Sequence, residues 1–129
     1  MAFGDTGCAA TELILTCSTP KEGAVNIEKG DAVVLTGNYE VSTIERENDP
    51  IFGVAMADAT TNRAAIPVQV RGICVFNYEG TKPLIDGCSG VLSSSLIGYV
   101  RAPDRPVQGT GSGIIVKVDT DAEQVHVLL

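Results

Sequence analysis

The stretch from Pro50 to Tyr78 constrains the fold of this chain more than any other part of its sequence. Its first part places three apolar residues on one face of an extended chain: Phe52, Val54 and Met56. The small residues Gly53, Ala55 and Ala57 fall on the other face. Segment 66–71 repeats the alternation, and a polar connection at 57–63 separates the two parts. Strict period-2 alternation is typical of a β-strand with one buried and one solvent-exposed face, so the stretch predicts two such strands.

The alternation stops after Gly72, because residues 73–76 (Ile-Cys-Val-Phe) are apolar on both faces. A strand buried on both sides gives this pattern, and so does a strand that bends at the glycine. The sequence leaves both readings open.

Further strands are expected along most of the chain. Fourteen Gly and six Pro favour many turns, and no helical periodicity extends beyond about two turns. Gly37-Asn38 is a two-residue turn signal, and a second hairpin is expected around Ser94-Ser95. The remaining expected strands are Thr11–Cys17, Ala32–Thr36, Tyr39–Ile44, Ile114–Val118 and Gln124–Leu129. The predicted fold is all-β, a compact β-sandwich or small barrel, with an extended N-terminal arm. Residues 1–20 are assigned to the arm and a first short strand, and residues 21–129 to a single β domain.

A weak internal repeat favours two related β halves. Gly30 and Val34-Leu35-Thr36 match Gly87 and Val91-Leu92-Ser93 at a constant spacing, and after a short insertion Gly53-Val54-Ala55 matches Gly113-Ile114-Ile115. Chance similarity between strands rich in Val and Gly is the alternative reading.

The charge of the chain excludes some classes of partner. Sixteen carboxylates against nine Lys and Arg give a net charge of -7, and the cations form no basic stripe. Binding to nucleic acid or to anionic membrane depends on such cations, so neither is expected as a partner. The N-terminus has no hydrophobic stretch long enough for a secretory signal, which favours synthesis in the cytoplasm.

No residue pattern points to catalysis, a metal or another cofactor. Cys8, Cys17, Cys74 and Cys88 form no C-x-x-C pair; reduced thiols are favoured, although three disulfide connectivities are formally open. His126 lies opposite Val125 and Val127 on its strand and is expected to be partly exposed. The 109–113 segment (GTGSG) lacks the Lys-Ser/Thr and the helix of a phosphate loop, and the 119–123 segment (DTDAE) lacks the spacing of a calcium loop. Both are expected to be turns.

The order of the segments resembles the head decoration (cement) proteins of tailed bacteriophages. The resemblance covers about residues 23–129 and includes KGDAVVLTG at 29–37, PIFGVAMADATTN at 50–62 and IPVQVRGICVF at 66–76. The later VLSSS segment with its following glycine is similar to the second half of that family. The N-terminal arm has no counterpart in it.

The resemblance implies a structural protein without enzymatic activity that binds the outer surface of an assembled head and stabilises it. The implied partners are the major capsid protein and further copies of the chain, as a homotrimer or a dimer, and the implied location is the virion. A tail, baseplate or host-surface (carbohydrate) binding module is the alternative. Contacts with the capsid or between copies are expected on the arm and on the loops at 80–90 and 101–113, with these candidate residues: Thr11, Leu13, Ile14, Leu15, Lys82, Leu84, Arg101 and Arg105.

Overall fold

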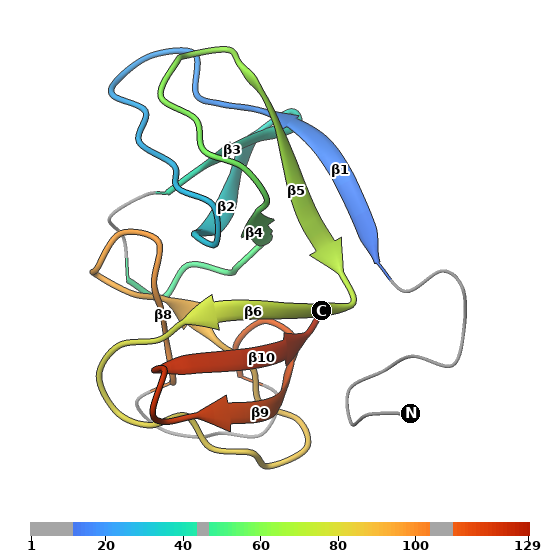
Figure 1. The fold of residues 1–129 in the computed structure, drawn as a ribbon, viewed down its shortest axis with the longest axis vertical. Coiled ribbons are helices and arrows are strands. Elements are labelled where there is room, and N and C mark those ends of the chain that lie inside the picture. The colour runs from blue at the N-terminus through green and yellow to red at the C-terminus, as the bar shows by residue number, and fades with distance from the viewer. Residues whose placement is uncertain (1–11, 44–46, 104–109) are drawn as a thin grey trace.

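The computed structural model describes residues 12–43, 47–103 and 110–129, and these residues form ten β-strands and no helix (Figure 1). The all-β prediction is therefore confirmed. The strands are β1 (Leu13–Ser18), β2 (Ala32–Gly37), β3 (Glu40–Ser42), β4 (Gly53–Ala55), β5 (Ala65–Arg71), β6 (Ile73–Asn77), β7 (Leu92–Ser93), β8 (Val100–Arg101), β9 (Ile114–Asp119) and β10 (Gln124–Leu128).

The first five strands close into a small barrel, called barrel 1 here, in the order β1-β3-β2-β4-β5. β1 pairs with β5 in antiparallel fashion along its length, and its last residue, Ser18, pairs with Glu40 of β3 in parallel. These two pairings make β1 part of the barrel wall. The sequence had grouped this strand with the arm, but the pairing places it in the body of the domain from Leu13 onward.

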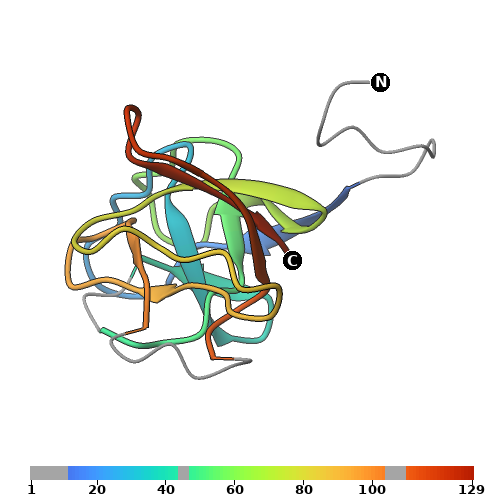
Figure 2. The ribbon, with the colours of Figure 1, turned by 90° about the horizontal axis from the view of Figure 1, so that it is seen from below.

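The last five strands form two sheets, β6-β10-β9 and β7-β8. Two isolated bridges, Tyr78 to Val100 and Val91 to Ser112, link these sheets in the order β6-β8-β7-β9-β10, which matches the strand order of barrel 1, so this half is called barrel 2 here. The bridge from Tyr78 to Val100 is parallel, as is the corresponding pair in barrel 1. Barrel 2 lies in front of barrel 1 when the molecule is viewed from below (Figure 2).

The two barrels agree in strand register and not only in strand order. Two pairs between β1 and β5 recur between β6 and β10, each residue 59 positions further along: Cys17–Ile66 and Leu15–Val68 correspond to Phe76–Val125 and Cys74–Val127. This agreement supports two related halves over chance similarity.

Gly53 and Gly113, the glycines matched in the sequence, occupy the same place in the two barrels. A Cβ atom at Gly53 would lie 2.3 Å from the carbonyl oxygen of Gln69 in β5, and one at Gly113 would lie 2.6 Å from that of Leu128 in β10. No side chain fits at these distances. Both halves therefore need glycine where the fourth strand approaches the fifth.

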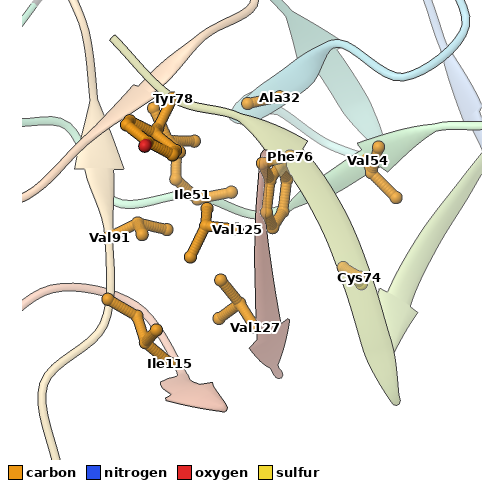
Figure 3. Close-up of a cluster of buried hydrophobic side chains, with 11 residues drawn as sticks. Ala32, Ile51, Val54, Cys74, Phe76, Tyr78, Val91, Ile115, Val125 and Val127 are labelled. Atoms are coloured by element: carbon orange, nitrogen blue, oxygen red, sulfur yellow. The ribbon is translucent and has the colours of Figure 1, made fainter. Parts of the chain in front are cut away.

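Each barrel has its own hydrophobic core, and the two cores meet at β4. The core of barrel 1 is formed by Cys17, Ile27, Val33, Val41, Ala55, Ile66, Val68 and Val70. The core of barrel 2 is centred on Phe76, and it also includes Ala32, Ile51 and Val54 from barrel 1 (Figure 3). Because side chains of barrel 1 complete the core of barrel 2, the two barrels form one folded unit.

The prediction of a solvent-exposed face for the strand at β4 is wrong. All three residues of β4 are buried: Ala55 points into barrel 1, and Val54 points out of it into the core of barrel 2. The strand is also shorter than predicted. Small residues looked like a solvent-exposed face in the sequence, but here they allow close packing between two layers.

The bend at Gly72 is confirmed. Gly72 has a φ of 95°, a backbone conformation that favours glycine, and the chain passes there from β5 in barrel 1 to β6 in barrel 2. Val75 in β6 is 38% exposed, so β6 is not buried on both faces. Of the two readings of the apolar segment 73–76, the bent strand is correct.

Candidate binding surface

The candidate contact residues fall into two groups in the structure. Leu13, Ile14 and Leu15 belong to β1 in barrel 1, whereas Lys82, Leu84 and Arg101 belong to barrel 2. Two further candidates, Thr11 and Arg105, lie outside the described residues.

The loop 79–91, between β6 and β7, presents the most exposed apolar pair of barrel 2. Its Pro83 is buried and anchors the loop to the barrel, while Leu84 and Ile85 are 58% and 59% exposed. Lys82 is also exposed. The loop thus combines a fixed base with an apolar tip and a neighbouring cation.

Two small cavities bring Lys82, Leu84 and Arg101 together. Lys82 and Leu84 line a cavity of about 150 Å³ with Ile115 of β9, and Arg101 lines another of about 250 Å³ with Glu79. Ala102 and Pro103 line both cavities. The Nη1 atom of Arg101 donates a hydrogen bond to Oδ1 of Asn48, which links β8 to the segment that follows barrel 1's β3. Three of the predicted contact residues therefore surround one short segment of barrel 2.

Asp86 holds the end of this loop in place. Its Oδ2 accepts a hydrogen bond of 2.6 Å from the hydroxyl of Ser89, and its Oδ1 accepts bonds of 2.9 Å and 2.7 Å from the backbone N–H groups of Cys88 and Ser89. These bonds, led by that from the Ser89 hydroxyl, lower the pKa of Asp86 from 3.8 to about 2. The ionised carboxylate is therefore the form that orders the loop.

The pKa of Asp86 predicts when the loop loses these bonds. Because the pKa is lower in the folded chain than in the unfolded chain, the stabilisation is present above the ordinary carboxyl range and is lost as the pH falls towards 2. In an NMR titration, we expect the amide proton signals of Cys88 and Ser89 to shift with a midpoint at about pH 2. Asp86→Asn should remove this titration. A midpoint near 3.8 would show that the carboxylate does not hold the loop.

The three candidate residues on β1 differ in how much of each side chain is exposed. Leu13 and Ile14 are each 48% exposed, whereas Leu15 is only partly exposed and packs against the core of barrel 1. Leu15 therefore offers less contact surface than its two neighbours on β1.

The residues that were candidates for catalysis or metal binding lie in ordinary structural environments. His126 is partly exposed between two fully buried valines, as predicted, and Asp119 Oδ1 accepts backbone N–H bonds from Asp121 and Ala122 in the turn after β9. Cys17, Cys74 and Cys88 are free thiols, and burial raises the pKa of Cys74 to about 11. Within the described ranges, no group of three or more His, Cys, Asp or Glu side chains is arranged to hold a metal ion.

The sequence did not single out several exposed apolar residues. Ile85 was missed beside Leu84, and eight others in the described residues belong to strands or turns: Leu35, Tyr39, Val75, Leu96, Ile97, Leu128, Ile114 and Val116. The only signal for the last two was the unbroken apolar run Ile114-Ile115-Val116, which cannot have one polar face.

No protein family model matches this chain, and a search of curated proteins gives no significant match. In the part of the chain that the structure describes, no helix is long and apolar enough to cross a membrane.

Proposed function

We propose that this chain is a capsid decoration protein, a structural protein without enzymatic activity that binds the outer surface of a tailed-phage head and stabilises it. The resemblance of residues 23–129 to that family supports the proposal. The fold is compatible with it, because the two halves share a buried core and form one folded unit that can present loops to a larger surface.

The observation that carries the proposal is the apolar tip at Leu84 and Ile85. Both side chains are more than half exposed in a chain with a net charge of -7, and their loop is anchored by Pro83 and by the hydrogen bonds of Asp86. Contiguous exposed apolar surface is a mark of protein-binding sites, and Leu84 and Ile85 are the most exposed adjacent apolar pair among the described residues. On a capsid, many copies of a modest contact would add up to a large total stabilisation of the shell.

Co-sedimentation with purified, expanded phage heads tests this function. We expect the wild-type chain to pellet with the heads, and the double variant Leu84→Asp/Ile85→Asp to bind at least about tenfold more weakly, because the contact would bury two unpaired charges. Leu96→Asp/Ile97→Asp is the matched control. Leu96 and Ile97 are also adjacent in sequence, are 50% and 41% exposed, and lie in the loop between β7 and β8.

Two results would contradict the proposal. A wild-type chain that stays in the supernatant with every head preparation tested would exclude capsid binding. Equal binding by the double variant and the wild type would show that the contact lies elsewhere than the 79–91 loop.

A further inference from the structure

Two backbone hydrogen bonds show which residues correspond in strands β2 and β7. The N–H of Phe52 donates to the carbonyl of Val33 at 2.9 Å, and the N–H of Ser112 donates to the carbonyl of Val91 at 2.8 Å. Phe52 and Ser112 each precede one of the two glycines that occupy the same place in the barrels. Val33 of β2 therefore corresponds to Val91, which immediately precedes β7.

In barrel 2, an extended segment fills the edge of β7 two residues further along, at Ser93. The N–H of Ser93 donates to the carbonyl of Asp49 at 3.0 Å, and its carbonyl accepts from the N–H of Asn48 at 3.0 Å. Beside them, Pro50 forms an antiparallel bridge with Leu92. Segment 48–50 thus pairs with β7 as an added strand, through main-chain hydrogen bonds.

In barrel 1, the equivalent edge lies at Leu35, two residues after Val33, and it is open in the described structure. The N–H and C=O groups of a strand point alternately to its two sides, and the carbonyl of Val33 is bonded on the β4 side. Those of Leu35 therefore point to the β4 side as well. There β2 pairs with β4 only at its first two residues, so in the described structure Leu35 presents a free donor and a free acceptor.

A groove lies beside this open edge. Its main part, of about 630 Å³, lies between residues 34–36 of β2 and residues 49–52. A second part of about 380 Å³ extends to Tyr39, which is 69% exposed. Leu35 and Phe52 line both parts, so the groove offers apolar walls beside the free main-chain groups. Its volume is in the range of about 300–1,000 Å³ that is usual for binding sites.

The charge along the groove favours a basic occupant. Asp49 lines the groove, and Glu40 lies beside it, because its Oε2 accepts a hydrogen bond of 2.9 Å from the hydroxyl of Thr36. No Lys or Arg is among the described residues that line either part. The whole chain has a net charge of -7. Positive charge on the occupant would therefore complement the site.

We propose that this groove binds an extended, basic segment of a partner protein, which pairs with Leu35 as an added strand. The backbone of the segment makes the two hydrogen bonds that segment 48–50 makes with Ser93 in barrel 2. One of its apolar side chains packs against Leu35 and Phe52, and a neighbouring Lys or Arg faces Asp49. In this mode the main chain supplies affinity and the alternate side chains supply specificity. The site shares no residue with the 79–91 loop, so this inference goes beyond capsid attachment.

Peptides selected from a random display library against the purified chain test the site. We expect the selected peptides to have alternating apolar residues together with Lys or Arg. Hydrogen exchange followed by NMR then locates them. In the free chain the amide of Leu35 should exchange rapidly, whereas that of Ser93, which is bonded to Asp49, should be protected. A bound peptide should slow the exchange of Leu35 by about tenfold or more and leave Ser93 unchanged.

Substitutions at Leu35 separate main-chain pairing from side-chain packing. Leu35→Pro removes the N–H donor and should weaken peptide binding by about tenfold or more, while the edge of a sheet tolerates proline. Leu35→Ala keeps the donor and should lose less. Leu96→Ala is the control and should bind as the wild type does, since Leu96 is 50% exposed but lies between β7 and β8. Circular dichroism checks that each variant is folded.

N-methylated peptides test the same hydrogen bonds with the wild-type chain. Methylation of alternate residues blocks the donors on one edge of the peptide, so one of the two alternating patterns should abolish binding and the other should preserve it. Selection of no peptide would overturn the proposal, and so would equal binding of both methylated forms. A chain that protects its own Leu35 amide by self-association would overturn it too, because a second copy would then be the occupant.

Discussion

Phe76→Ala is expected to destabilise the chain by about 3–5 kcal/mol, which is a large part of the about 5–15 kcal/mol that holds a typical domain folded. Phe76 is fully buried at the centre of the barrel 2 core, where it packs with residues of both barrels (Figure 3). Removal of its ring loses the transfer free energy of the side chain and leaves a cavity. Urea unfolding should show a lower midpoint with an unchanged slope, because the two cores unfold together.

Val75→Ala is the matched control for this substitution. Val75 is next to Phe76 on β6 but is 38% exposed on the outer face of the barrel. Its truncation should change the free energy of unfolding by less than about 1 kcal/mol. If Phe76→Ala were no more destabilising than Val75→Ala, the barrel 2 core would not be packed as described. Two separate transitions in Phe76→Ala would contradict the shared core.

Gly53→Ala is expected to cost about 3 kcal/mol, because the added methyl group has no space. Its Cβ would lie 2.3 Å from the carbonyl oxygen of Gln69 and 2.8 Å from a methyl group of Val68, and both belong to the neighbouring strand β5. Relief of the clash would require β4 and β5 to separate, although β4 is buried between the two cores. Thermal unfolding followed by circular dichroism measures the loss.

Gly37→Ala is the control for Gly53→Ala. A Cβ at Gly37 would meet only the side chain of Glu40, with the nearest atom at 3.3 Å, and Gly37 is exposed. Its cost should stay within about 1 kcal/mol, since a flexible carboxylate can move aside. Equal losses for the two variants would indicate a general glycine effect and not the close approach of β4 to β5.

Local patterns in the sequence were enough to predict the strands and turns. The bend at Gly72 and the final hairpin around 119–123 depend on residues close together in the chain, and the structure has both. The hairpin predicted at Gly37-Asn38 is also present, but its turn lies one residue later, at Asn38-Tyr39, because Gly37 pairs with Glu40. The match between Gly53 and Gly113 also identified a real equivalence, because both glycines meet the carbonyl of a fifth strand. What the sequence could not show is which outer faces become covered.

β4 is an example of an outer face whose burial the sequence does not predict. Val116 is an example of a strand residue whose exposure the sequence does not predict. The alternation around Val54 correctly indicates a strand, but only the docking of barrel 2 buries its second face. An identical local pattern would result if that face were open to solvent. Likewise, the exposure of Leu35 and Val116 follows from the absence of a second layer over them in the described structure, and no residue near them in sequence encodes it.

The most direct test is a cryo-electron microscopy reconstruction of purified, expanded phage heads incubated with this chain. We expect density for this chain on the outer surface, with the loops that hold Leu84 and Ile85 against the shell. A shell without density for this chain would contradict the proposed function. Bound chains that contact the shell through another surface would contradict the role of the 79–91 loop while leaving capsid binding in place.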